Sequence, residues 1–179
     1  MVEIIANIHI HTVYSDGSKL HRSIANDAIR AGVDVLFVTD HNIHIQDIEG
    51  YYENQSGKVL IIMGEEIHDL NANPQKNHML ALGTSKSLAQ FADRRKTLID
   101  EIHSDGGLSF IAHPNDPAMP AFNESAIPWE DWSVKGYSGI ELWNGFSELK
   151  VRAHTKAAAY FYAFFPKFLP FSPPRETLI

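Results

Sequence analysis

Three side chains that can bind a metal ion lie close together near the N-terminus. His9, His11 and Asp16 fall within eight residues. The segment 4–11 has the apolar content of a strand, and side chains two residues apart in a strand face the same side. His9 and His11 therefore project together, next to the carboxylate that follows. Burying polar groups costs free energy unless they are paired. The pattern therefore predicts a metal site and not two histidines packed in the hydrophobic core.

Further imidazoles and carboxylates accompany other predicted strands. His41, Glu66 and His113 each follow a buried strand, whereas His78 begins one. Imidazole with carboxylate, and no thiolate, suits zinc, manganese, iron, nickel or cobalt better than calcium. One catalytic zinc needs only three or four ligands, so the set predicts at least two metal ions. Such a site activates water and clamps both oxygens of a displacement. The candidate ligands are His9, His11, Asp16, His41, Glu66, His78 and His113.

Each of several other polar residues has two possible roles. Asp40 is either a ligand or an acceptor that fixes the tautomer of a neighbouring histidine, and we favour the second. Glu65 neighbours Glu66 on a strand, so only one of them faces the site, and Glu65 is read as solvated or structural. Glu141 is either satisfied in the core or reaches the site. Tyr14 and Asn144 are read as substrate contacts or as structural residues.

The remaining histidines are expected to make ordinary hydrogen bonds. A single histidine at a strand end is more often a satisfied polar group than a ligand. A histidine in the last turn of a helix, such as His103, is also favoured by the helix dipole. This group contains His21, His44, His68, His103 and His154.

Short buried strands alternate with helices along the whole chain. Strands are predicted over 4–11, 33–38, 59–63, 78–83, 108–112 and 139–142, and helices over 20–31, 45–52, 88–103 and 147–165. Gly32 is expected to end the first helix, Ser87 to cap the third, and residues 166–174 to break regular structure. The alternation favours a parallel α/β sheet or barrel, in which reactive residues collect at the carboxyl ends of the strands.

Composition excludes several classes of protein. The 179 residues suit a single domain. The net charge of −7 disfavours duplex nucleic acid as a partner, because phosphate neutralisation needs a basic surface. The absence of cysteine excludes disulfides, thiolate zinc sites and a cysteine nucleophile. No signal peptide is read at the N-terminus, and no window is long enough to span a bilayer. We therefore expect a cytoplasmic protein with no membrane partner.

Five sequence blocks together resemble one known family. They are His9-Ile10-His11-Thr12-Val13-Tyr14-Ser15-Asp16-Gly17, Thr39-Asp40-His41-Asn42, Gly64-Glu65-Glu66-Ile67, Asn77-His78 and Ala112-His113-Pro114. In this order they resemble the PHP (polymerase and histidinol phosphatase) domain. The block Glu141-Leu142-Trp143-Asn144-Gly145 looks like one found in stand-alone PHP phosphoesterases.

The resemblance implies a fold, a reaction and a division of ligands. The fold would be α/β, a distorted (β/α)7 TIM-like barrel, with residues 1–179 as one PHP domain. The reaction would be hydrolysis of a phosphoester of a small molecule by a metal-bound hydroxide, with two or three zinc, manganese or iron ions. His9 and His11 would hold one metal with Glu66, which would bridge to a second metal. The second metal's other ligands would be His78 and His113, and the third metal's would be Asp16 and His41.

The resemblance also suggests assisting roles and one departure. Asp16 or His113 would assist proton transfer, and Tyr14 and Asn144 would contact the substrate. The family pattern closes with a further strand that carries Asp-x-His, and nothing after Leu142 fits it. We therefore expect a domain incomplete at its C-terminus, with fewer metals bound or with self-association through an exposed flank that includes the aromatic run 160–165. Two alternatives stay open: a hydrolase of another ester or carbamate, and a non-catalytic metal-binding module.

Overall fold

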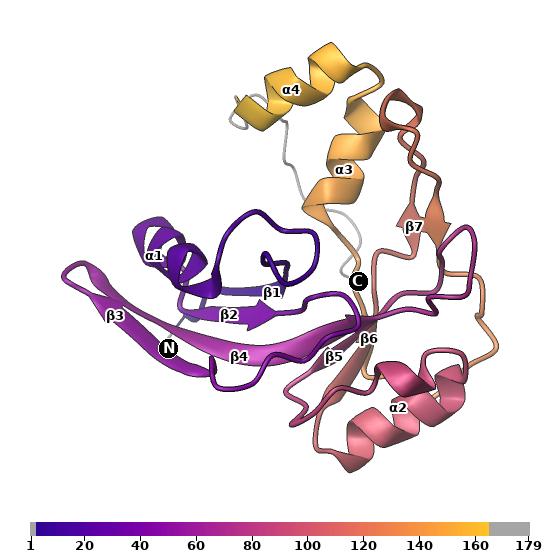
Figure 1. Cartoon of the computed structure of the whole chain (residues 1–179), viewed down its shortest axis with the longest axis horizontal. Coiled ribbons are helices and arrows are strands. Elements are labelled where there is room, and N and C mark those ends of the chain that lie inside the picture. The colour runs from indigo at the N-terminus through magenta and orange to yellow at the C-terminus, as the bar shows by residue number, and fades with distance from the viewer. Residues whose placement is uncertain (1–2, 165–179) are drawn as a thin grey trace.

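The computed structural model describes residues 3–164, which form a curled mixed sheet flanked by helices (Figure 1). The sheet has seven strands, and β3 (Gly50–Asn54) pairs only with β4. A separate hairpin joins β7 (Asn115–Asp116) to β8 (Ile127–Pro128). The path through the main sheet runs β1 (Ala6–Ile10), β2 (Val35–Val38), β4 (Gly57–Ile67), β5 (Met79–Leu82), β6 (Leu108–Ile111) and β9 (Gly139–Ile140).

Strand direction corrects the prediction of a wholly parallel sheet. β1, β2 and β4 are parallel, and so are β6 and β9, but β5 is antiparallel to both of its neighbours. In that register Met79, at the start of β5, lies opposite both Ile67 and Ile111. The start of β5 therefore meets the ends of β4 and β6. This arrangement explains why a useful histidine precedes a strand here instead of following one.

The segment predicted as a helix over 45–52 is instead a loop that leads into a β-hairpin, whose first strand, β3, begins at Gly50. β3 pairs antiparallel with β4, with Asn54 opposite Gly57. The side chains alternate, since Tyr51 is exposed and Tyr52 packs against the core, as in a strand with one buried face. Gly57, at φ 155°, closes the turn in a backbone region that favours glycine. Pairing with β4 overrides the weak helical spacing of the segment.

Helices cover the sheet on its outer side. α1 (His21–Ala31) ends at Gly32 with φ 73°, as predicted, and buries Ala25 and Ala28 against the cluster around β2 and β4. The predicted helix 88–103 is a short 3-10 turn, η1 (Ala89–Phe91), followed by α2 (Arg95–Ser104). Ser87 accepts from the Ala89 N–H at 3.4 Å and donates to Glu65 at 2.7 Å.

The last predicted helix, 147–165, is two helices. α3 (Gly145–Arg152) and α4 (Lys156–Phe164) are separated by a break, and a second 3-10 turn, η2 (Pro120–Phe122), lies in the preceding loop. Phe165 and the predicted break over 166–174 lie outside the described residues. Over residues 3–164 no helix combines the length and apolarity needed to cross a membrane.

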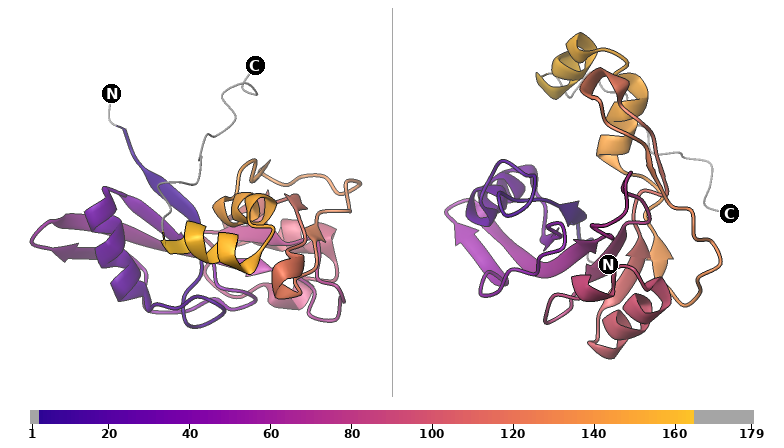
Figure 2. Two further views of the ribbon diagram at one scale, coloured as in Figure 1. Left: turned by 90° about the horizontal axis from the view of Figure 1, so that it is seen from above. Right: turned by 45° about the vertical axis from the view of Figure 1, so that its right-hand side comes forward.

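The sheet curls into a half-barrel whose edge strands are β1 and β9 (Figures 1 and 2). Two main core clusters lie against it, one around α1, β2 and β4 and the other around α2, β5 and β6. The α/β class is confirmed. The sheet formed by residues 3–164 is open between β1 and β9, so a closed (β/α)7 barrel is not confirmed.

Candidate metal centre

Glu66 is the residue on which the histidines converge. It lies near the end of β4, and its side chain is 1% exposed. Oε2 is contacted from the β1 and β2 side and Oε1 from the β5 and β6 side. The ring nitrogens around this carboxylate are His9 Nε2 at 3.0 Å, His11 Nε2 at 3.0 Å, His41 Nδ1 at 3.3 Å, His78 Nδ1 at 2.8 Å and His113 Nε2 at 2.8 Å.

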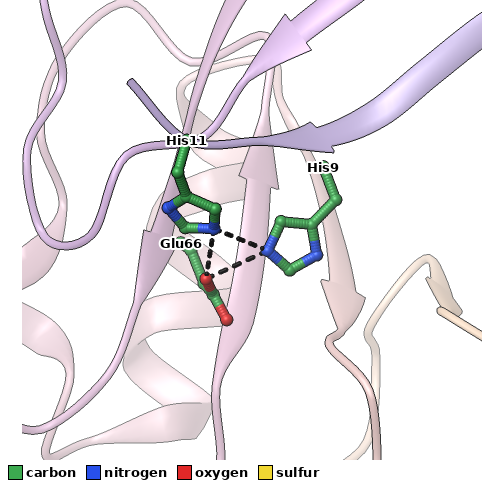
Figure 3. A group of neighbouring side chains, drawn as sticks. All are labelled: His9, His11 and Glu66. Atoms are coloured by element: carbon green, nitrogen blue, oxygen red, sulfur yellow. Dashed lines mark hydrogen bonds and ion pairs between the residues drawn. The ribbon is translucent and has the colours of Figure 1, made fainter. Parts of the chain in front are cut away.

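The two histidines of β1 act as a pair, as their spacing predicts. Both rings project from the same side of the strand toward Glu66 (Figure 3). Their Nε2 atoms lie 3.0 Å apart, and each lies 3.0 Å from Glu66 Oε2. Two nitrogens and one oxygen in a tight triangle are suited to share a single cation.

The candidate ligand atoms form three overlapping groups. Within each group the ligand atoms lie within 4.8 Å of one another: His9, His11 and Glu66; His11, Asp16 and His41; and His41, Glu66 and His78. The groups share His11, His41 and Glu66, so they form one continuous cluster. His113 joins it through Glu66 Oε1. The division of these residues among individual metal ions stays a prediction.

The charges in the cluster are strongly coupled. Burial alone would raise the pKa of Glu66, but the charge on His9 and hydrogen bonds from His11, His113 and His78 hold it well below its usual range. Burial opposes the charged form of His9, yet Glu66 and Glu141 outweigh it and raise the pKa of His9 to about 10. The contact with His41, whose Nε2 lies 3.6 Å from Asp16 Oδ2, lowers the pKa of Asp16 to about 2. Without a metal, the raised pKa of His9 therefore favours a protonated ring beside the buried carboxylate.

Asp40 organises the loop that connects His11 to Asp16. Its Oδ1 accepts from the Thr12 N–H at 2.7 Å and the Ser15 hydroxyl at 2.6 Å, and its Oδ2 accepts from the Thr12 hydroxyl at 2.7 Å. Within residues 3–164 these partners include no histidine, so the prediction that it fixes a histidine tautomer directly is wrong. It acts one step away, since Ser15 Oγ lies 3.3 Å from His11 Nδ1.

Gly17 completes the same loop. A Cβ atom at this position would lie 2.3 Å from the His11 carbonyl oxygen and 2.8 Å from the Thr12 nitrogen. Both are backbone atoms that cannot rotate away. Only glycine allows the loop to fold back so closely on the residue that carries a candidate ligand.

The two predicted substrate contacts differ in position. A cavity of about 1060 Å³ is lined by the histidine cluster on one side and by the start of α3 on the other. Asn144 lies in its wall, where its side chain caps α3 and donates to Glu141. Tyr14 is 47% exposed and lies outside that lining. Both roles stay predictions.

Sequence reasoning missed the placement of His68 beside the cluster. Its ring stacks on His78 with centroids 4.5 Å apart and meets His41 edge-on at 5.2 Å. The side chain is buried, and burial lowers its pKa to about 4. The sequence could have indicated this placement, because His68 lies two residues after Glu66, the same spacing that places His9 and His11 on one face of a strand.

Other residues behave as predicted. His44 contacts the Thr84 carbonyl at 2.7 Å, and His103 contacts the Ser109 hydroxyl at 3.0 Å. Glu65 is fully buried on the opposite face of β4, where it accepts from Ser87 and from the Leu88 N–H at 2.9 Å. It is therefore structural rather than solvated. Glu141 reaches the site, where its Oε1 lies 3.0 Å from His9 Nδ1.

Comparison with known proteins gives distant similarities. No protein-family model matches the chain. An uncharacterized protein, MJ1587 from Methanocaldococcus jannaschii, is 24% identical over 152 residues, which are 79% of this chain and 82% of the relative. A two-domain protein from Bacteroides vulgatus, described as containing a predicted PHP-like metal-dependent phosphoesterase, is 25% identical with a TM-score of 0.45. That match covers 62% of this chain and only about a third (35%) of the other.

Proposed function

We propose that this chain is a metal-dependent hydrolase that cleaves a phosphoester of a small molecule. The observation that carries the proposal is the convergence of five imidazoles on one buried carboxylate, Glu66, in the wall of a large cavity. A core histidine needs one or two partners, and five of them around one carboxylate exceed any structural need. The resemblance of the motifs to PHP phosphoesterases supports the same reaction.

The residues present fit two or three divalent ions. The two oxygens of Glu66 cannot pair with every nitrogen of the five rings. Three ring nitrogens are buried without a hydrogen-bond partner: His41 Nδ1, His78 Nε2 and His113 Nδ1. His41 Nδ1 faces Glu66 Oε2 at 3.3 Å without forming a hydrogen bond. The donors are nitrogen and carboxylate oxygen, which suit zinc, manganese or iron. Bound ions would neutralise a phosphoryl group and make water acidic enough to act at neutral pH.

The protein side chains would have distinct tasks. His9, His11 and Glu66 would hold one ion, and Glu66 with His78 and His113 a second. His41 and Asp16 would hold a third at the more open side, since the Asp16 side chain is 66% exposed.

Proton transfer and substrate contact fall to residues around that centre. Asp16, at the more open side, or His113, whose Nε2 lies 2.8 Å from Glu66 Oε1, would assist proton transfer. Asn144 would contact the substrate from the α3 wall, and Tyr14 from the loop after β1.

The test compares two ester classes and two matched variants. The purified chain is supplied with zinc, manganese or iron and assayed on a phosphomonoester and on a carboxylic ester. We expect turnover of the phosphomonoester, and a loss of about 100-fold or more in Glu66→Gln, as for removal of a group central to transition-state charge. Glu53→Gln, an exposed carboxylate on β3, should match the wild type.

Three results would overturn parts of the proposal. Unchanged phosphomonoester turnover in Glu66→Gln would remove Glu66 from the mechanism. Faster cleavage of the carboxylic ester or of a carbamate would identify another hydrolase on the same cluster. Absence of turnover together with fewer than two bound metals would identify a non-catalytic metal-binding module.

A further inference from the structure

Glu141 connects the two edges of the curled sheet across the histidine cluster. It directly follows β9, at one edge, and its Oε1 lies 3.0 Å from Nδ1 of His9 on β1, the other edge. Its Oε2 accepts from the backbone N–H of His113 at 2.8 Å. The residue is 7% exposed. One carboxylate thus contacts two candidate ligands, His9 on the edge strand β1 and His113 after β6.

The contact with His9 determines which ring nitrogen is free. An ionised carboxylate only accepts hydrogen bonds, so the nitrogen that faces Glu141, Nδ1, carries a proton. The other nitrogen, Nε2, faces His11 Nε2 and Glu66 Oε2, both at 3.0 Å. A histidine held in this way presents its Nε2 lone pair to a cation once Nε2 loses its own proton.

Asn144 holds Glu141 in turn. Its Nδ2 donates to Glu141 Oε1 at 3.1 Å, and its Oδ1 accepts from the N–H groups of Phe146 and Ser147 at 2.9 and 3.0 Å. One amide side chain therefore caps α3 and fixes the carboxylate. The position of Glu141 is tied to the helix that forms the opposite wall of the cavity.

We propose that Glu141 is a positioning residue that orients His9 from behind, with Nδ1 protonated and Nε2 directed at the metal centre. The proposal rests on the proposed function only in that Nε2 binds a metal. It assigns Glu141 a task other than ligation, and it gives Asn144 a second task beside the proposed contact with the substrate. Outer partners of this kind contribute about 10- to 100-fold to metal affinity.

Two glutamine variants give a matched test. In Glu141→Gln the single amide oxygen cannot serve the donors on both sides, because the amide NH2 must face either His9 Nδ1–H or the His113 N–H. In Glu65→Gln the partner Ser87 is a hydroxyl that can reverse its role, so both bonds survive. The second variant therefore controls for loss of a buried carboxylate elsewhere in the same sheet.

The first readout is zinc affinity of the metal-free full chain, titrated against a competing chelator. We expect Glu141→Gln to bind zinc about 10- to 100-fold more weakly than the wild type, and Glu65→Gln to bind within about twofold. Circular dichroism and urea unfolding serve as controls that both variants are folded at the temperature of the titration. Equal zinc affinity in Glu141→Gln and the wild type would overturn the proposal.

The second readout does not need bound metal. In protein with 15N-labelled histidine, the buried Nδ1–H of His9 should give a slowly exchanging signal, assigned by its absence in His9→Gln. We expect that signal in the wild type and in Glu65→Gln, and its loss or fast exchange in Glu141→Gln. The same signal in all three proteins would overturn the proposal for Glu141, whether or not the wild type binds zinc. Failure of the wild type to bind zinc would instead refute the proposed function.

Discussion

Replacing Asp40 with alanine tests whether the loop after β1 is held by a buried carboxylate. Asp40 is fully buried and accepts three bonds of 2.6–2.7 Å, two of them from Thr12, which is also fully buried. Asp40→Ala removes all three acceptor contacts and leaves the Thr12 N–H without a partner. His11 lies just before this loop and Asp16 lies within it, so both stability and metal binding should respond.

The magnitude follows from the number and burial of these bonds. A hydrogen bond to a charged group contributes about 1.5–3 kcal/mol, and a buried donor left unpaired costs about 1–3 kcal/mol. Removing the carboxylate also removes its own desolvation cost, so the contributions do not simply add. We expect the free energy of unfolding of the metal-free protein to fall by about 3–5 kcal/mol, and zinc affinity to fall by about 10- to 100-fold.

Asp40→Asn gives a graded comparison. Its amide oxygen can still accept from the Thr12 N–H and from Ser15, so we expect a loss of only about 1 kcal/mol. Asp34→Ala is the control, because Asp34 is exposed and accepts one backbone bond from Ile5 at 2.8 Å, away from the histidines.

The assays for this series are urea unfolding of the metal-free protein and a zinc titration against a chelator. If Asp40→Ala unfolded within 1 kcal/mol of the wild type and bound zinc equally well, the loop would not depend on this carboxylate.

Three further predictions follow from single contacts. Gly17→Ala should weaken zinc binding by about tenfold or more, since its Cβ would meet the His11 carbonyl at 2.3 Å; unchanged affinity in a chelator titration would show that the loop adapts. Lys150→Met should lower the free energy of unfolding by about 3–5 kcal/mol, because Asp116, 2.5 Å from its ammonium and 4% exposed, would be left buried without a cation. Adding Asp116→Asn should restore part of that loss in urea unfolding. Burial raises the pKa of Glu65 in the folded protein. The contribution of Glu65 to the free energy of unfolding is therefore fully present below its ordinary pKa of about 4.5, and it is lost as pH rises through the folded pKa. Glu65→Gln should therefore gain stability relative to the wild type between pH 4.5 and pH 8, and a constant difference across that range would contradict the assignment.

Local patterns in the sequence predicted the parts of the structure that depend on neighbouring residues. The i, i+2 spacing of His9 and His11 placed both rings on one strand face, because alternation along a strand is a local property. Gly32 ended its helix because a left-handed residue there favours glycine. The convergence of strand ends on one site followed from the alternation of strands and helices.

Pairing between distant segments was not predicted. The sequence does not state that β5 runs antiparallel to β4, and without that fact His78 had no evident route to Glu66. The strand over Gly50–Asn54 forms because β4 offers a partner, which no local propensity encodes. An acceptor role was favoured for Asp40 over metal ligation, but its partners, Thr12 and Ser15, became visible only in the folded loop.

Metal content of the purified chain tests the central claim most directly. We predict two or three divalent ions per chain by elemental analysis after exposure to zinc, manganese or iron and removal of free metal, as expected for imidazole and carboxylate donors. Glu66→Gln should retain at most one, because its carboxylate contacts all five imidazoles. A wild-type chain without bound metal, or a Glu66→Gln variant with the full complement, would contradict this claim.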